Sequence, residues 1–436
     1  MSTHEGGRGA ARRVALHASL CLGAMLSLQS PAAAEVIAIV GGTVETASAA
    51  GSIPGGTVLI RDGRIVAVGA EVEIPAGASR IDARGKIVTP GLVDPESILG
   101  IVEVNAEPGT VDHTVANDHF GAVLEAADAF NPRSIAIPVN RIEGVTRAIV
   151  SPTGVAGAVV VGRSAAVNLG DLGNPVDRRH VAVRVQLGEA GAAQAGGSRT
   201  AALARLREAL ADARDYQRHH GAWEQAARRD YGLHHFDLEA LQPVLRGEMP
   251  LAVEVHRARD IEVVVQLAVE HGIRLVVIGG AEAWMVADEL AAAGAAVVLD
   301  PVANLPMRFE TLGATLENAA RLHAAGVPIA LMTPMGRGHN PRNVTQGAGV
   351  AVAHGLPWQA GLAAITASPA RIFGLEGVGQ LQPGFEADVV IWDGDPLEVT
   401  SYPDAVFIKG RAVPMESRQT LLRDRYMERL GLPRAR

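Results

Sequence analysis

The chain has 436 residues, of which 48% are hydrophobic and 3% aromatic, and its formal net charge at pH 7 is −8. Length alone predicts about two to three domains. The hydrophobic share is large enough for a sizeable core, which excludes a disordered or fibrous chain. The scarcity of aromatic residues argues against a stacking platform for single-stranded nucleic acid, and the acidic balance argues against a phosphate-binding surface. We therefore expect a globular protein with no nucleic-acid partner.

Residues 1–34 have the three parts of a secretory signal peptide. A basic start that includes Arg12 and Arg13 is followed by an apolar stretch at 14–28 and by small residues at 32–34. The apolar stretch is too short to span a membrane. Cleavage would also remove Cys21, the only cysteine, and would leave no disulfide and no thiolate metal ligand. We expect a periplasmic or secreted protein without a membrane span, exported by either the general or the twin-arginine route.

Both ends of the mature chain are predicted to form short β-strands. The sequence predicts strands at 36–40, 57–60, 65–68, 387–392 and 405–409. Asp62-Gly63, between two of these runs, is a hairpin signal. We expect residues 35–90 and 376–413 to pair into one small β-sandwich domain that is built from both chain ends.

Residues 91–375 alternate apolar strands with amphipathic helices. The predicted strands are 145–150, 158–161, 181–185, 251–255, 275–278, 296–299 and 329–331. Helices are predicted between several of them, at 260–270, 282–292 and 316–325. Buried strands of this kind favour a parallel sheet covered on both faces, and about eight such units are typical of an α/β fold with a (β/α)8 TIM-like barrel. A doubly wound open sheet remains the alternative.

Three further helices are predicted. Residues 200–229 are rich in Ala, Leu, Arg and Glu, with leucines repeating on one helical face. This helix is either a lid or partner-binding element or, as we favour, an elongated barrel helix with a solvated outer face. A second helix is predicted at 360–373, and a charged amphipathic helix at 417–430 lies within a C-terminal segment, 414–436.

Four segments of the chain resemble the amidohydrolase superfamily, in particular its imidazolonepropionase-like branch. They read GGTVLIRDGRI at 55–65, GKIVTPGLVD at 85–94, TASPAR at 366–371 and GQLQPGFEADVVI at 379–391. The resemblance implies metal-assisted hydrolysis of C–N bonds in amides, ureas or cyclic imides. It also implies a divalent metal held by imidazoles and carboxylates at the C-terminal ends of the barrel strands, where active sites of this fold lie.

Several ligand positions implied by the resemblance hold residues that cannot bind a metal. The family's first strand ends in His-x-His, and Ile98 stands at the second of these positions. The sixth strand should supply a histidine but has none, and Pro334 stands where the eighth strand should supply an aspartate. The two lysines, Lys86 and Lys409, both lie in the predicted β-sandwich, so a carboxylated lysine that bridges two metals is excluded.

Three residues remain as candidate metal ligands: Glu96, Glu189 and His256. Glu96 occupies the first His-x-His position, Glu189 follows the strand at 181–185, and His256 matches the family's histidine on the fifth strand. Zinc sites need about three or four well-placed protein ligands, so we assign no metal with certainty and leave open a single zinc-like divalent ion. His256 is the predicted acid/base, and Glu96 and Glu189 are predicted to supply charge.

The loop after the eighth strand holds candidate substrate-binding residues. Arg337 suits a carboxylate and His339 lies beside it, although a solvated polar loop would look the same in sequence. The adjacent histidines at 219–220 and 234–235 resemble metal pairs, but neighbouring residues point apart on a helix. We expect these four histidines at the surface.

Two hypotheses about function follow from the residues and the resemblance. The first is an exported hydrolase of non-peptide C–N bonds, such as those of cyclic amides, with a degraded metal centre and an acid/base role for His256. The second is a non-catalytic member that binds a small ligand or acts as the partner subunit of an active amidohydrolase. Either form could be a homo-oligomer or pair with a related chain.

Overall fold

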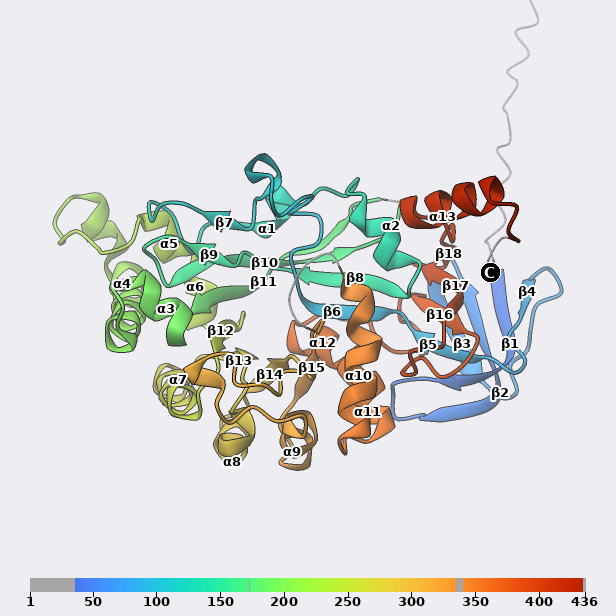
Figure 1. Cartoon of the computed structure of the whole chain (residues 1–436). Helices are drawn as coiled ribbons and strands as arrows, with labels where there is room; N and C mark the ends of the chain where they lie inside the picture. Colours follow the sequence, from blue (N-terminus) through green and yellow to red (C-terminus); the bar gives the residue numbers. More distant parts are fainter. Residues whose placement is uncertain (1–35, 172, 335–339, 434–436) are drawn as a thin grey trace, which may run out of the picture. The chain divides into compact units, whose positions relative to one another are not determined.

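The computed structural model describes residues 36–171, 173–334 and 340–433. The predicted signal peptide therefore lies outside the described residues. The described part of the chain belongs to one compact unit, which contains two eight-stranded sheets (Figure 1). Within it, no helix is both long and apolar enough to cross a membrane.

One sheet forms a nearly closed barrel. Its strands, in spatial order, are β6 (Leu92–Ser97), β8 (Val145–Val150), β10 (Val160–Asn168), β11 (Val176–Gln186), β12 (Leu251–Val255), β13 (Leu275–Gly279), β14 (Ala296–Leu299) and β15 (Ile329–Leu331). At the closure, the hydroxyl of Thr333 after β15 lies 3.5 Å from the carboxylate of Asp94 on β6. These observations agree with the predicted barrel and not with the open-sheet alternative.

Strand β10 runs antiparallel to both of its neighbours, β8 and β11. The prediction of an all-parallel sheet was therefore wrong at this strand, which also extends past the predicted 158–161. Only residues 151–159 connect β8 to β10, which is fewer than the dozen or so that a crossover between parallel strands needs. The chain consequently returns through the short strand β9 (Gly154–Val155) instead of through a helix.

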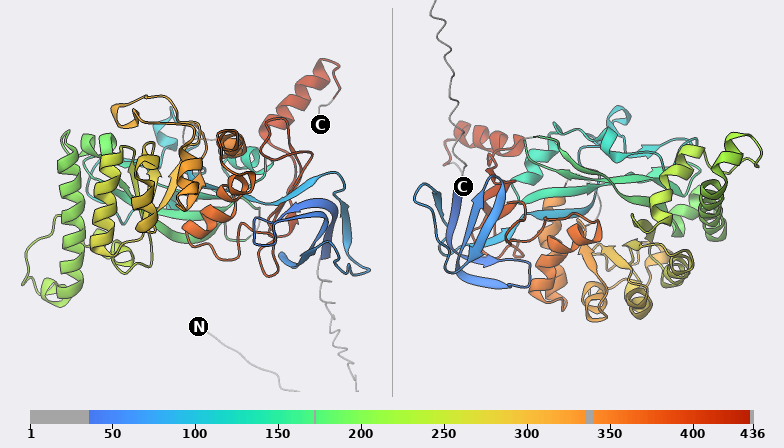
Figure 2. Two further views of the ribbon diagram at one scale, coloured as in Figure 1. Left: turned by 90° about the horizontal axis from the view of Figure 1, so that it is seen from below. Right: turned by 180° about the vertical axis from the view of Figure 1, so that it is seen from behind.

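The helices surround the barrel strands. They are α1 (Ala126–Ala129), α2 (Ala136–Arg141), α3 (Gly188–Gln194), α4 (Arg199–Glu224), α5 (His235–Ala240), α6 (Gln242–Leu245), α7 (Ala258–His271), α8 (Ala287–Ala292), α9 (Asn318–Ala324), α10 (Val344–Ala353), α11 (Trp358–Ala364) and α12 (Ala367–Ile372). Figure 2 shows from two further sides how the green to orange helices line the outside of the sheet. The prediction of one helix at 360–373 was wrong. The helix breaks after Ala364 because Pro369 cannot donate to the carbonyl of Ile365 and its ring would clash there.

The second sheet joins the two ends of the chain. Its strands are β1 (Val36–Glu45), β2 (Ser52–Arg61), β3 (Arg64–Gly69), β4 (Ser79–Asp82), β5 (Ile87–Pro90), β16 (Val389–Trp392), β17 (Pro403–Ile408) and β18 (Arg411–Ala412). Antiparallel pairing of β5 with β16 places Val88 opposite Ile391. Asp62 and Gly63 form the β2–β3 turn with φ of 50° and 77°, as a two-residue hairpin requires. The arrangement of this sheet as a sandwich stays a prediction.

A buried ion cluster lies where the two sheets meet. Arg147 on β8 is 1% exposed and pairs with Asp177 at 2.8 Å. It also pairs with Glu386 and Asp388, which directly precede β16. Lys409 adds a second cation at 2.7 Å from Asp177. The barrel and the β-sheet of the chain ends are therefore held together by charge as well as by backbone connections.

Candidate active site at the barrel mouth

His256 lies at the C-terminal edge of the barrel sheet, directly after β12. Val255 pairs with Gly279 at the end of β13, and Gly279 has φ of +91°. A Cβ atom at position 279 would lie 2.9 Å from Nδ1 and 3.0 Å from Nε2 of His256. The imidazole thus fills the space next to the residue from which the family's sixth strand would present a histidine.

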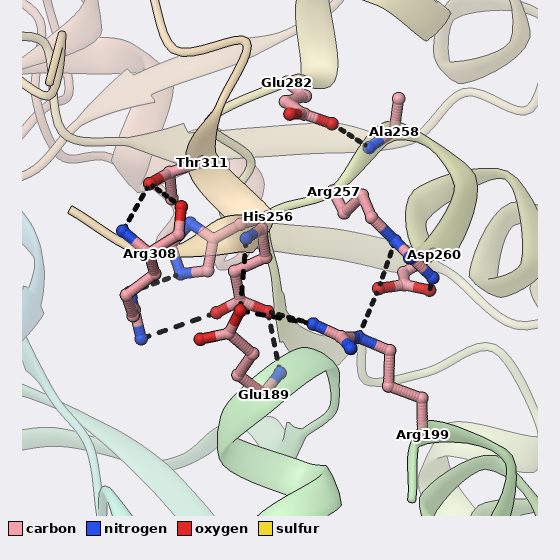
Figure 3. A network of polar contacts seen from close by, with 10 residues as sticks. Glu189, Arg199, His256, Arg257, Ala258, Asp260, Glu282, Arg308 and Thr311 are labelled. Atoms are coloured by element: carbon pink, nitrogen blue, oxygen red, sulfur yellow. Dashed lines mark hydrogen bonds and ion pairs between the residues drawn. The ribbon is translucent and has the colours of Figure 1, made fainter. Parts of the chain in front are cut away.

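The imidazole of His256 faces a guanidinium. Nη2 of Arg308 lies 3.3 Å from Nε2 of His256 (Figure 3). Arginine is always a donor, so Nε2 accepts in this contact and the ring proton belongs on Nδ1. Arg308 precedes the short helical turn η3 (Phe309–Thr311), where its backbone N–H donates to the Thr311 hydroxyl at 3.2 Å.

Glu189 and Glu310 bind each other's backbone. The Glu310 carboxylate accepts from the N–H of Glu189 at 2.7 Å, and the Glu189 carboxylate accepts from the N–H of Glu310 at 3.2 Å. Glu310 is 1% exposed, and burial raises its pKa, although the Glu189 N–H and the charge of Arg308 partly oppose this. Gly188 makes room, because a Cβ there would overlap the Glu310 carboxylate.

Arg199 extends this network to the outer helices. Its guanidinium lies 3.4 Å from Glu189 and 3.2 Å from Asp260, and Asp260 also binds Arg257 at 2.6 Å (Figure 3). Glu282 accepts from the N–H groups of Ala258 and Gly313, each at 2.9 Å. Helices α3, α4 and α7 and the segment after β14 are therefore tied together around His256.

A second polar chain lies inside the barrel. Glu96 on β6 and Arg184 on β11, each 1% exposed, form an ion pair at 3.0 Å. Arg184 lies 3.5 Å from Glu254 on β12, and the Ser151 hydroxyl donates to Glu96 at 3.3 Å. The guanidinium thus lies between carboxylates from two strands that carry ligand positions in the family.

Asp94 lies two residues before Glu96 and is fully buried. Burial raises the pKa of Asp94 to about 8, and the hydrogen bond from the Glu96 N–H only partly opposes this effect. The Thr333 hydroxyl lies 3.5 Å from it. A protonated Asp94 can therefore donate a hydrogen bond at the barrel closure near neutral pH.

The described donor atoms do not fit the metal centre that the resemblance implies. The carboxylate of Glu96 is ion-paired with Arg184. Ile98 is a buried apolar side chain, and neither Gly279 nor Pro334 has a side-chain atom that could bind a metal. In residues 36–171, 173–334 and 340–433, no group of three or more His, Cys, Asp or Glu side chains could hold a metal ion. The required three or four ligands are not assembled by this part of the chain.

The structure joins two of the predicted site residues in one network. His256 and Glu189 are linked through Arg308 and Glu310, whereas the described contacts of Glu96 are those inside the barrel. The predicted substrate residues Arg337 and His339 lie outside the described residues.

Four residues of these polar networks were not predicted from the sequence, namely Arg184, Glu254, Arg308 and Glu310. The first two carried a signal, because an arginine and a glutamate inside apolar strands must be paired when buried. Arg308 and Glu310 carried none, since the segment after β14 has no periodic pattern.

The histidine pairs differ from one another. His219 and His220 are exposed and lie 3.1 Å from Asp215 and 3.5 Å from Glu224. The ring centroids of His234 and His235 lie only 4.3 Å apart, so the expectation that the two side chains point apart was wrong for this pair. The reason is that His234 is the N-cap of α5, with extended ψ of 145°, and not a helical residue.

Comparison with known proteins identifies the family. The model of the amidohydrolase family matches residues 145–414, which is more than half of the chain, so the chain belongs to this family. A crystal structure of an amidohydrolase from Thermotoga maritima MSB8 superposes with a TM-score of 0.78 at 27% identity, covering 87% of this chain and 99% of that one. The barrel assignment is thereby supported by a structure of nearly the same extent.

The curated relatives match over only part of their length. Amidohydrolase tasK of Hapsidospora irregularis is 27% identical over 404 residues, which cover 82% of this chain and 40% of that protein. Imidazolonepropionase of Paracoccus denitrificans is 37% identical over 118 residues, which cover 26% of this chain and 28% of that protein. The chain thus spans less than half of the length of these relatives, and the assignment to the imidazolonepropionase-like branch stays a prediction.

Proposed function

We propose that this chain is a hydrolase of small molecules that cleaves non-peptide C–N bonds at the barrel mouth without the divalent metal of its family. The single observation that carries the proposal is the buried ion pair of Glu96 with Arg184 at 3.0 Å. Glu96 stands at the family's first ligand position. A cation would have to displace the guanidinium before this carboxylate could coordinate it, and breaking a buried pair is costly.

The groups that could act on a substrate are His256 and Arg308. A guanidinium suits a substrate carboxylate or a carbonyl oxygen that gains negative charge. When Arg308 turns to such a group, Nε2 of His256 is released and can take a proton from water as the water attacks the carbonyl carbon. The C–N bond then breaks, and the same proton passes to the leaving nitrogen, so amide and water give a carboxylic acid and an amine. The acid then loses its proton to solvent water at neutral pH.

A second candidate function is the binding of a small ligand without turnover. It is favoured by the contact between Nε2 of His256 and Arg308 at 3.3 Å, because a base whose lone pair is engaged cannot accept a proton. The two candidates differ in whether the substrate itself breaks this contact.

Hydrolysis of cyclic amides and N-acyl amino acids by the full chain tests the proposal. We expect turnover that survives a chelator and falls by at least about 100-fold in His256→Ala. His323→Ala, which changes an exposed histidine on α9, is the matched control and should keep full activity. Turnover that needs a stoichiometric bound metal would contradict the metal-free proposal, and saturable binding without turnover would support the second candidate.

We also propose that the mature chain begins near residue 35 and is exported. The support is the basic, apolar and small-residue order of residues 1–34. Expression of the full chain in a Gram-negative host, with mass analysis of the periplasmic fraction, should give a product shortened by this segment. An unprocessed cytoplasmic product would contradict it.

A further inference from the structure

A groove lies between α2 and the last helix, α13 (Arg418–Arg429), which run close to each other (Figure 1). Its volume is about 460 Å³, which is in the range of small-molecule sites. The side chains that line it include Arg133, Ile135, Arg418, Leu421, Leu422 and Arg425. It lies apart from the His256 network, whose residues do not line it.

The helix α13 presents one face to this groove. Residues 418, 421, 422 and 425 follow the i, i+3, i+4, i+7 spacing of one helical face. Leu421 is 56% exposed and Leu422 39%, and α13 contains no buried residue. On the opposite wall, Ile135 is 53% exposed. The groove therefore has an apolar floor that the described part of the chain leaves open to water.

The rim of the groove is positively charged. Arg133, Arg418 and Arg425 make no ion pair with any residue that the structure describes, whereas Arg423 on the same helix pairs with Asp424 at 2.7 Å. The formal charge of the whole chain is −8, and this rim nevertheless gathers three guanidiniums without carboxylate partners among the described residues. Unpaired guanidiniums next to an apolar floor suit a ligand with an anionic head and an apolar tail.

We propose that this groove binds a small amphipathic anion, namely a carboxylate or phosphate that carries a short alkyl chain. The alkyl chain lies on Leu421, Leu422 and Ile135, and the head group binds the arginines of the rim. Carboxylate and phosphate heads share the same chemistry toward guanidinium, so the choice between them is left to measurement.

Titration calorimetry of the full chain with four probes tests the proposal. Decanoate and decyl phosphate carry both parts of the ligand, decanol carries only the tail, and acetate carries only the head. We expect saturable binding of decanoate, decyl phosphate or both, and binding of decanol and acetate that is weaker by about tenfold or more, since each lacks one contribution. The tighter of the two anions identifies the head group. Equal binding of decanol and decanoate would overturn the proposal.

Matched variants locate the binding. Arg425→Gln should weaken decanoate binding by about tenfold, as expected for one charge-assisted contact, whereas Arg423→Gln should leave it unchanged. Leu421→Ser should weaken binding in the same way, and Leu430→Ser, at a more exposed position beyond the groove, should not. The absence of buried residues in α13 keeps these variants folded, which circular dichroism checks.

Other occupants of the groove would give different results. Binding to vesicles with anionic lipid but not to free decanoate or decyl phosphate would indicate a membrane surface and would overturn the proposal. Concentration-dependent dimerisation that Leu421→Ser abolishes, without decanoate binding, would indicate a second copy of the chain and would overturn it as well.

Discussion

The imidazole of His256 packs against the backbone of Gly279 and occupies the space that a side chain at position 279 would need. With a side chain at position 279, the ring could not keep its place, because the nearest Cβ contacts to its nitrogens would be 2.9 and 3.0 Å. The glycine is thus a condition for the present position of His256. A second histidine at this edge, as the family resemblance implies, would require His256 to move.

Gly279→Ala should displace the His256 ring and destabilise the fold. We expect a loss of about 1–3 kcal/mol in the free energy of unfolding beyond that of Gly294→Ala, because only position 279 is overpacked. Gly294 has φ of +62° and no heavy atom near its Cβ position, so it controls for backbone strain. Denaturant unfolding and the imidazole resonances of His256 give the measurement, and equal losses in the two variants would contradict the steric account.

Arg184 neutralises two carboxylates inside the barrel, and its removal should be costly. Arg184→Met should lower the free energy of unfolding by about 3–5 kcal/mol, because Glu96 and Glu254 would be left buried without their cation. Adding Glu96→Gln to this variant should restore part of the loss. Arg259→Met, which breaks an exposed pair with Glu262 on α7, is the control. A control loss as large as that of Arg184→Met would argue against a special role for the buried cation.

At this scale, the sequence was informative about residue types but not about their partners. Glu189 and His256 follow predicted strands, whereas Glu96 stands at a ligand position that the family resemblance implies. Their partners Arg308, Glu310 and Arg184 come from other elements, and no local pattern encodes such tertiary contacts. Arg184 and Glu254 were visible as charges within apolar strands, and a rule that buried charges need partners would have paired them.

The secondary-structure elements were predicted best for short barrel strands that are buried along their whole length. The strands at 145–150, 251–255, 296–299 and 329–331 have the bounds that the structure gives. The direction of β10 could not be obtained from its composition, because a buried strand has the same apolar run in either direction. The direction follows from the connection between β8 and β10, which is too short for a crossover between parallel strands. The split between α11 and α12 was readable from Pro369.

The carboxylate of Glu310 in the turn η3 is buried, and this burial predicts a pH effect. Burial raises the folded pKa of Glu310 above its ordinary value of 4.5. The folded state therefore holds the proton more tightly than the unfolded state. The contribution of this group to the free energy of unfolding is greatest below the ordinary pKa of 4.5 and is lost as pH rises through the folded pKa.

Glu310→Gln should remove this pH dependence while keeping an oxygen that accepts from the Glu189 N–H. We expect the free energy of unfolding of the variant to match that of the parent at about pH 4.5 and to exceed it at about pH 7.5. Glu317→Gln, in an exposed pair with Arg321, should give no such crossover. A difference between variant and parent that stays constant with pH would contradict the assignment.

Two features join the two eight-stranded sheets into one molecule: the pairing of the chain ends and the ion cluster around Arg147. The pairing of both chain ends was anticipated from β-rich runs at 36–68 and 387–409, because strands that cannot be satisfied within one short segment need partners. The junction itself was not anticipated. Arg147 lies within a strand that was predicted only as apolar, and its partners are distant in sequence.

Arg147→Met tests whether this junction stabilises the molecule as one unit. We expect a loss of about 3–5 kcal/mol in the free energy of unfolding, because Asp177, Glu386 and Asp388 would be left without the guanidinium that neutralises them. Arg84→Met, in a pair that is largely exposed, should have no measurable effect. Hydrogen exchange should quicken at β8 and β16, on the two sides of the junction, more than at β13.

The pH dependence of the same variant separates charge from packing. Burial by itself raises the pKa of Asp177, but the charge of Arg147 and the hydrogen bond from Lys409 outweigh burial and leave this pKa below its ordinary value of 3.8. A lowered folded pKa gives stability that is present above the ordinary value and is lost as pH falls through the folded pKa. The deficit of Arg147→Met should therefore shrink in acid, where the carboxylates of the parent are protonated as well. A deficit that is the same at every pH would mean that the arginine acts through the packing of its methylene groups and not through its charge.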